Sequence, residues 1–427
     1  MRTSNKEINL WEKTKSLIPE GTNTLSKRPN LFPEGSYPIY IDSGKGSHIF
    51  DIEGNEYIDY PMALGSISLG HAYPATIEAV ANQMQKGVNF SLINPLETEL
   101  AEVLSEVIPC CEMSRYFKTG SECVSAVVRL VRAYTGKNKI ICCGYHGWHD
   151  WYMSIMGRER GVLKGAGDDT LSFQYNDYDG LKKVFDENSG EIAAVIMEPM
   201  SVVEPENDFL NKVKELTHKN KAVFVFDEMV TGFRYSLGGA QEYFKVTPDL
   251  GCFGKAISNG FPLAVICGKK EIMDNVWANE DFFVTSTYSG ETISISAALS
   301  TIKEMKETDY FPQTLKMGKM FKNGLNELAK EEGVEVECRG FQRMHLFFNS
   351  KKLPSLDQKS LFLQETIKDG ILFGNIMYIS YSHSLEDIQR SLDAARRAFK
   401  ILKNAQEKGS VDGFVSGKTA SEPVRKV

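Results

Sequence analysis

Long apolar runs are absent from the 427-residue sequence. No stretch approaches the roughly eighteen apolar residues that a membrane-spanning helix needs, and residues 1–30 lack the apolar core of a secretory signal. An excess of basic residues is also absent, because the net charge is −7 at pH 7. We therefore expect a cytoplasmic protein that binds neither membranes nor nucleic acid.

The eight cysteines show no spacing that is typical of a structural metal site. Two adjacent pairs, Cys110–Cys111 and Cys142–Cys143, stand beside four scattered residues, and no C-x-x-C occurs. We expect buried free thiols in a reducing compartment. The segment 144–150 (GYHGWHD) offers three possible metal ligands, His146, His149 and Asp150, but no fourth ligand at a plausible spacing, so we predict no metal.

Composition and pattern indicate a soluble enzyme with more than one domain. Residues 48–60 alternate around a Glu-Gly-Asn turn and predict a hairpin, whereas strand-like runs alternate with helical patterns farther along. Ser384 is placed to cap a final helix. We predict an N-terminal arm and hairpin (1–60), a large α/β domain with a mostly parallel sheet flanked by helices (61–309), a smaller α+β domain (310–404) and a mobile polar tail (405–427).

Two residues at the ends of apolar runs carry the strongest chemical signal. Asp227 follows the strand-like run 222–226, and Lys255 follows the run 250–254. Ligand groups of α/β sheets gather at such strand ends. Pyridoxal phosphate (PLP) needs an amine to form an imine with its aldehyde and an acid to keep its pyridine nitrogen protonated. A nucleotide phosphate loop is excluded, because it requires glycine where Asp249 stands.

Two further features suit the same cofactor. Thr119, Gly120 and Ser121 turn into a predicted helix, and backbone amides with a hydroxyl at a helix start bind phosphate. Each of these residues is also an ordinary choice for capping a helix. Tyr145 follows the strand-like run 139–143 and offers an aromatic face on which a flat ring could stack.

Ten segments in register resemble the class III, fold-type I PLP aminotransferases, and within them the glutamate-1-semialdehyde aminomutase branch. The segments are LIPEGTNTL (17–25), GSHIFDIEGNEYIDY (46–60), LGHAYP (69–74), TGSE (119–122), RLVRAYTGK (129–137), YHGWHD (145–150), MEP (197–199), FDEMVTGFR (226–234), FGKAISNGFP (253–262) and TYSG (287–290). The resemblance implies a seven-stranded, mostly parallel sheet in the large domain. It also implies a smaller domain formed by the C-terminal part and the N-terminal arm.

The resemblance implies a role for each matched residue. Lys255 would hold the cofactor as an internal aldimine and shuttle a proton between the substrate and the cofactor, and Asp227 would pair with the pyridinium nitrogen. The other implied contacts are Gly120 and Ser121 with the phosphate, Tyr145 and Met229 with the two ring faces, and Glu198 near the phenolic oxygen. Thr287 resembles a threonine that reaches the phosphate of the neighbouring subunit, which implies a homodimer with shared active sites.

The sequence departs from the aminomutase branch at substrate positions. Lys27 stands where the branch usually has an arginine, and a lysine cannot form the bidentate fork that grips a carboxylate. Leu64 replaces a tryptophan, and Asn375 replaces a glutamate. With Thr24, these residues form the predicted substrate set. Because the cofactor positions match and the substrate positions differ, the pattern indicates the same chemistry on another substrate.

We therefore predict a PLP-dependent aminotransferase that moves an amino group from an amino-acid donor to an aldehyde or ketone by a ping-pong mechanism. A sugar-derived or other specialised biosynthetic intermediate is one candidate for the acceptor. Glutamate-1-semialdehyde aminomutase is the main alternative. A racemase or decarboxylase of the same fold shares the first step. A non-catalytic scaffold is disfavoured, because Lys255 and Asp227 are both present.

Overall fold

The computed structural model describes residues 3–422 and divides the chain into two compact units. The large unit comprises Ser66–Ser68 and Pro74–Phe311. The small unit comprises the chain up to Gly65, the segment Leu69–Tyr73 and the chain from Pro312. Each unit has a hydrophobic core of its own.

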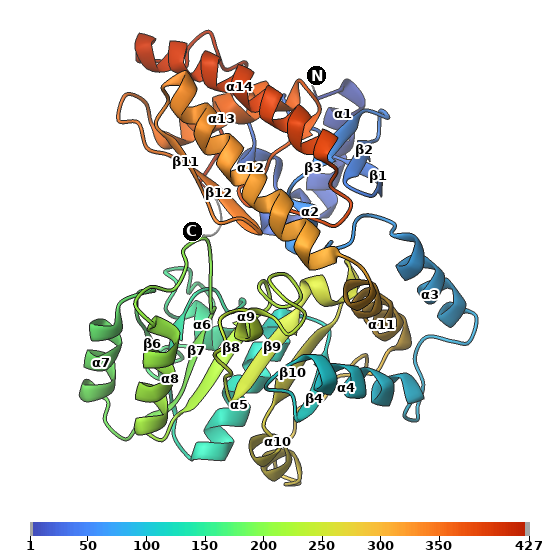
Figure 1. Cartoon of the computed structure of the whole chain (residues 1–427), viewed down its shortest axis with the longest axis vertical. Coiled ribbons are helices and arrows are strands. Elements are labelled where there is room, and N and C mark those ends of the chain that lie inside the picture. The colour runs from blue at the N-terminus through green and yellow to red at the C-terminus, as the bar shows by residue number, and fades with distance from the viewer. Residues whose placement is uncertain (1–2, 423–427) are drawn as a thin grey trace. The chain divides into compact units, whose positions relative to one another are not determined.

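A seven-stranded sheet organises the large unit (Figure 1). In spatial order its strands are β4 (Met113–Phe117), β10 (Ala264–Gly268), β9 (Leu250–Gly254), β8 (Val223–Glu228), β7 (Ile192–Met197), β5 (Lys139–Cys143) and β6 (Thr170–Ser172). Only β10 runs antiparallel to its neighbours, and the five strands from β9 to β6 are parallel. The predicted seven-stranded, mostly parallel sheet is thus confirmed.

Helices cover both faces of this sheet, because its central strands are apolar on both sides. On one face, α5 and α10 pack against alternate strand residues such as Ile196 and Val225. On the other face, α7 and α8 pack against the intervening residues, among them Val195 and Phe226. The helices of this unit are α3 (Pro74–Met84), α4 (Pro95–Val107), α5 (Gly120–Thr135), α6 (Asp150–Met153), α7 (Tyr178–Glu187), α8 (Phe209–Lys219), α9 (Ala240–Tyr243), α10 (Lys270–Trp277) and α11 (Thr292–Glu307), with the 3-10 turn η4 (Lys255–Ser258).

The small unit joins the N-terminal arm to the C-terminal part of the chain. Its strands form a sheet in the order β1 (Ile41–Lys45), β2 (His48–Asp51), β3 (Glu56–Asp59), β13 (Ile371–Leu372), and a second sheet in the order β11 (Val336–Arg339), β12 (Arg343–Phe348), β14 (Met377–Tyr378). Its helices are α1 (Asn5–Leu17), α2 (Met62–Gly65), α12 (Tyr310–Glu332, with its first two residues in the large unit), α13 (Ser355–Ile367) and α14 (Leu385–Lys408), with 3-10 turns η1 (Pro19–Gly21), η2 (Leu25–Lys27) and η3 (Pro29–Leu31). Ser384 caps α14 as predicted, with its side chain accepting from the Asp387 N–H.

The small unit extends past the predicted boundary at residue 60. The segment 61–65 packs on Tyr378, because a Cβ added at Gly65 would lie 2.8 Å from that ring. Tyr378 also donates its backbone N–H to the carbonyl of Tyr60, at 2.8 Å. These contacts connect the segment with the strands near the C-terminus rather than with the large sheet.

The tail predicted from Ala405 overlaps α14 in the part of the chain that the structure describes. Ala405 is fully buried within α14, which continues to Lys408 and ends at Gly409 in a left-handed conformation. The following segment then returns to α13, since the Ala420 N–H donates to Ser360 Oγ at 2.8 Å. Residues of this segment form hydrogen bonds with side chains of α13. A prediction based only on low hydrophobicity does not detect such bonds. Residues 423–427 of the predicted tail lie outside the described residues.

Candidate active site

The carboxyl ends of four parallel strands in the large unit bring the predicted catalytic residues to one edge of the sheet. Asp227 in β8 pairs in register with Cys252 in β9, so Lys255 follows only two residues beyond Phe253, the partner of Glu228. In β7, Met197 pairs with Phe226, which places Glu198 beside Asp227 along the same edge. This edge is where α/β sheets bind their ligands.

Asp227 is almost completely buried, with 2% of its surface exposed. Its Oδ2 lies 2.7 Å from Nδ1 of His146, and its Oδ1 accepts the Met229 N–H at 3.1 Å. His146 Nε2 lies 3.2 Å from the carbonyl oxygen of Cys143, which can only accept, so Nε2 carries a proton. A buried carboxylate that is fixed in this way can hold a protonated ring nitrogen.

His146 is the functional residue that the sequence argument missed. The segment 144–150 raised it only as a possible metal ligand, and His146 is 81 positions from Asp227 in the chain. The signal that could have found it is its position three residues after the end of the apolar run 139–143, in a strand-end loop like those of Asp227 and Lys255.

Glu228, the neighbour of Asp227, is fully buried but has a structural role. It accepts the N–H groups of Ala240 and Gln241, at 2.7 and 2.9 Å, and the hydroxyl of Thr231. Burial raises the pKa of Glu228, and these hydrogen bonds oppose the shift. Adjacent acids in β8 thus face opposite sides of the sheet, and only Asp227 lies on the side of His146.

Tyr145 and Glu198 meet at the next two strand ends. The backbone N–H of Tyr145 donates to Glu198 Oε1 at 2.9 Å. The preceding Gly144 has a φ of +111°, and a Cβ there would lie 2.8 Å from Cγ of Glu198, so only glycine fits. The half-buried ring of Tyr145 packs edge-on against Tyr152, with ring centroids 5.7 Å apart.

The N-terminus of α5 forms the candidate phosphate site. Thr119 caps this 16-residue helix together with Glu122 in a capping box, and Gly120 and Ser121 form its first turn, as predicted. Ser121 Oγ accepts the Trp148 N–H at 3.3 Å. Helix N-termini attract anions through exposed N–H groups and the helix dipole. The loop after β5 therefore lies against the predicted phosphate residues.

Met229 lies close to both Gly120, in the candidate phosphate site, and Gly254, at the end of β9. A Cβ added at Gly120 would lie 3.1 Å from Sδ of Met229, and one at Gly254 would lie 2.6 Å from the same atom. Gly254 directly precedes Lys255. The two glycines thus allow the α5 N-terminus, β8 and β9 to approach one another closely.

Lys255 begins η4 with a φ of +50°, a left-handed conformation that costs a residue with a Cβ about 1–2 kcal/mol. The turn is held from outside, because Ser68 donates its hydroxyl to the Ala256 carbonyl at 2.8 Å and its N–H to Asn259 Oδ1 at 3.0 Å. Strained backbone that the surroundings maintain is typical of functional sites.

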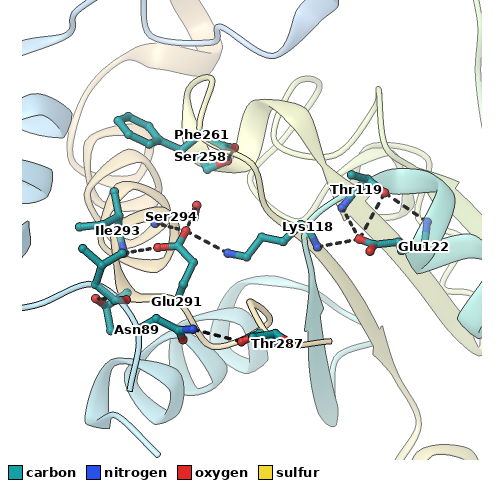
Figure 2. Close-up of polar contacts among 12 residues, drawn as sticks. Asn89, Lys118, Thr119, Glu122, Ser258, Phe261, Thr287, Glu291, Ile293 and Ser294 are labelled. Carbon is teal, nitrogen blue, oxygen red and sulfur yellow. Dashed lines mark hydrogen bonds and ion pairs between the residues drawn. The ribbon is translucent and has the colours of Figure 1, made fainter. Parts of the chain in front are cut away.

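Thr287 lies in an exposed turn that precedes α11 (Figure 2). Its carbonyl oxygen accepts Nδ2 of Asn89 at 3.3 Å. The role in a neighbouring subunit that the resemblance implies for Thr287 stays a prediction.

The four predicted substrate residues all belong to the small unit. Thr24 precedes η2, Lys27 is exposed, and the half-buried Leu64 has a φ of +61°. The carbonyl oxygen of Asn375 lies 2.5 Å from Nδ1 of His345. Arg28, which follows Lys27, pairs with Glu20 at 2.8 Å, so its guanidinium is already engaged locally.

All eight cysteines are buried and free, as expected. Burial, with a contribution from the charge of Glu198, raises the pKa of the Cys143 thiol to about 12, so this thiol near the site is unreactive at neutral pH. Within residues 3–422, no three His, Cys, Asp or Glu side chains are grouped so that they could hold a metal ion. In the same range, no helix combines the length and the apolar character that crossing a membrane requires.

Solved structures of PLP-binding proteins and transaminases share this fold. The FumI protein of Sphingopyxis sp. MTA144, in its PLP internal aldimine form, matches with a TM-score of 0.88 at 24% identity, over 98% of this chain and 99% of that chain. An omega-transaminase from Sphaerobacter thermophilus matches with a TM-score of 0.85 at 24% identity, over 93% and 98%. The fold is therefore that of the fold-type I PLP-dependent transaminases.

The sequence comparisons identify the family. Residues 32–390 match the family model of the class-III aminotransferases. A 3-aminobutyryl-CoA aminotransferase from Cloacimonas acidaminovorans is 36% identical over 409 residues, which cover 93% of this chain and 97% of the relative. A glutamate-1-semialdehyde 2,1-aminomutase from Acetivibrio thermocellus is 34% identical over 92% and 97% of the two chains. The chain belongs to the class-III aminotransferase family and is a PLP-dependent enzyme.

Proposed function

We propose that this enzyme transfers an amino group from an amino-acid donor to an aldehyde or ketone acceptor, with Lys255 and Asp227 as its catalytic residues. One observation carries the proposal: an acid and a lysine end adjacent parallel strands, and the N-terminus of a long helix lies beside them. When bound, PLP withdraws electrons from the carbon that bears the amino group.

The residues at the sheet edge divide the work. Lys255 would hold the cofactor aldehyde until the donor amine displaces it, and the freed Lys255 amine would then move a proton to and from the carbon that bears the amino group. Asp227, which His146 orients, holds the proton on the pyridine nitrogen. The proposed binding contacts are the phosphate for Gly120 and Ser121, the two ring faces for Tyr145 and Met229, and the phenolic oxygen for Glu198.

We also propose a cytoplasmic homodimer in which Thr287 contributes to the phosphate site of the partner subunit. The exposure of the turn that carries Thr287 supports this proposal.

The acceptor is the open part of the function. We propose that Thr24, Lys27, Leu64 and Asn375 select it, and that it differs from glutamate 1-semialdehyde. Support comes from Lys27, whose side chain cannot provide a bidentate grip on a carboxylate, and from Arg28, which pairs with Glu20. The similar relatives include both an aminotransferase that acts on 3-aminobutyryl-CoA and aminomutases, so both substrates belong in the test.

A half-reaction with single amino acids tests the chemistry. The near-visible absorbance of the lysine-bound cofactor should disappear when a productive donor is added and return when a carbonyl acceptor follows. Lys255→Ala should lack the starting band, whereas Lys270→Ala, a control at an exposed lysine of α10, should keep it. A Lys255→Ala protein that keeps the band, or a wild type that no donor in a broad panel bleaches, would refute the proposal.

The second arm separates transfer from internal exchange. Glutamate 1-semialdehyde and 3-aminobutyryl-CoA are each incubated with the loaded enzyme, without a second substrate. Conversion of the semialdehyde to its amino-exchanged isomer would identify an aminomutase and overturn the proposed acceptor. Bleaching by 3-aminobutyryl-CoA that is reversed only by an added carbonyl compound supports transfer between two molecules.

A further inference from the structure

A nearly buried ion pair joins the first turns of two helices beside the candidate phosphate site (Figure 2). Nζ of Lys118 lies 3.0 Å from Oε1 of Glu291, and their side chains are only 14% and 12% exposed. Lys118 directly precedes the turn 119–121, and Glu291 directly follows the turn 287–290, which carries Thr287. The pair therefore connects the two segments to which phosphate contacts are assigned.

Both ends of the pair are anchored in helix caps. The N–H groups of Lys118 and Thr119 donate to Glu122 Oε2 at 3.2 and 3.0 Å, which fixes the backbone at the start of α5. Glu291 caps α11 and accepts the N–H groups of Ile293 and Ser294 at 2.8 and 3.0 Å. The ion pair therefore joins two capped helix starts.

The turn between Thr287 and Glu291 has little freedom. A Cβ added at Gly290 would lie 2.7 Å from the carboxylate carbon of Glu97 in α4, and the Asn89 side chain holds the Thr287 carbonyl. These contacts hold the turn from one side, and Glu291 with its ion pair follows it directly in the chain.

The electrostatics also require the pair to stay intact. Burial lowers the pKa of Lys118, and Glu291 opposes that shift. Burial acts to raise the pKa of Glu291, but hydrogen bonds with Ser294 and Lys118 outweigh it, and the net shift is downward. Glu291 is consequently an anion close to the segment where an anionic phosphate is expected, and only the ammonium of Lys118 neutralises it among the contacts that the structure describes.

We propose that Lys118 and Glu291 are positioning residues for the cofactor phosphate: their ion pair fixes the turn 119–121, which is assigned to the phosphate of the same subunit, and supports the turn of Thr287, which is assigned to the phosphate of the partner subunit. The inference rests on the proposed function, in which α5 binds the phosphate. It predicts that the pair contributes to recognition of the phosphate group and not of the pyridine ring.

The test compares PLP with pyridoxal, which lacks the phosphate. Apo-protein is titrated with each compound, and the dissociation constant of pyridoxal is divided by that of PLP. This ratio is determined for wild type, Lys118→Met, Glu291→Gln, the double variant and Lys118→Arg. Lys306→Met is the matched control, because Lys306 in α11 pairs with Glu106 in an exposed ion pair away from the cap. Thermal unfolding is followed in parallel.

Lys118→Met should weaken PLP binding by about tenfold or more and change pyridoxal binding by less than about twofold, since removing one partner of a buried pair leaves the other charge unpaired. Lys118→Arg and Lys306→Met should keep the wild-type ratio. The double variant should lose no more than Lys118→Met, because the residues act as one unit. If Lys118→Met fails to fold, Glu291→Gln, which retains a capping oxygen, serves instead and should also lower the ratio.

A Lys118→Met or Glu291→Gln protein with the wild-type ratio, or equal losses for PLP and pyridoxal, would overturn the inference and leave the pair a purely structural role. Failure of the proposed phosphate site at α5, the part of the proposed function on which this inference rests, has a different signature. In that case wild type itself would fail to prefer PLP over pyridoxal, and the assignment of α5 as phosphate site would fall together with this inference.

Discussion

Replacing His146 with phenylalanine provides a direct test of the His146–Asp227 pair. Phenylalanine retains a ring that can pack against Trp151 and Tyr152, whose centroids lie 6.2 and 5.4 Å from that of His146. It removes both ring nitrogens, so Asp227 keeps the N–H of Met229 and loses the contact at 2.7 Å. Removing a hydrogen-bonding partner of a buried carboxylate costs about 3 kcal/mol. We expect the melting temperature of the apo-protein to fall by about 3 °C, because the unfolding entropy of a 427-residue chain is about 0.9 kcal/mol/K.

A double-mutant cycle shows whether the loss comes from this contact. The cycle uses His146→Phe, Asp227→Asn and the double variant, and the free energy of unfolding is measured for each apo-protein by denaturant titration. We expect a coupling of about 2 kcal/mol between the two positions. His149→Phe is the matched control: His149 lies in the same loop and bonds to Ser125 at 2.7 Å, with no carboxylate, so its loss should be about 1 kcal/mol.

The same variants report on the cofactor. In the His146→Phe protein, Asp227 has lost the partner that orients it. The near-visible absorbance band of the bound cofactor should therefore shift, and the dissociation constant of PLP should rise. A coupling below about 0.5 kcal/mol, or a His146→Phe protein as stable as His149→Phe, would refute the reasoning, because Asp227 would then not depend on His146.

Two further predictions concern the small unit. Hydrogen bonding to Asp387 at 3.0 Å raises the pKa of His48, so its protonated form stabilises the fold below about pH 6.5 and the effect is lost as the pH rises through the raised pKa. His48→Gln should therefore lower the melting temperature more near pH 5.5 than near pH 9, and an equal loss at both pH values contradicts the assignment. Ser384→Ala should destabilise by about 1 kcal/mol, because it removes the cap of the 24-residue helix α14, whereas Ser355→Ala at an exposed position should have little effect in the same melting experiment.

The elements that could be predicted from the sequence are those whose signals lie within a few residues. Apolar runs of four to six residues predicted the central strands, because strands buried on both faces need no polar alternation. The capping residues Thr119 and Ser384 were also predictable, since a side chain three positions from its backbone partner makes the whole interaction local. The positions of Asp227 and Lys255 at strand ends follow from the same patterns.

The tail shows where such reasoning is incomplete. Its low hydrophobicity predicted mobility, yet Ala405 lies in the core and the Ala420 N–H bonds to Ser360, 60 residues earlier. A small residue contributes little to any hydrophobic pattern, and a single hydrogen bond to a distant helix leaves no periodic signal. Only the packed structure shows that such residues have partners.

The sequence by itself determined the class of this enzyme, because its lysine, its acid and its helix caps are encoded in short segments whose order alone specifies them. The tertiary structure decided which residues support them. His146 meets Asp227 across 81 residues, and Lys118 meets Glu291 across 173. Contacts of this kind depend on the order and register of strands in the sheet, which arise only when distant apolar surfaces pack together. Short sequence segments therefore specify the catalytic residues, and the tertiary fold determines which distant residues position them.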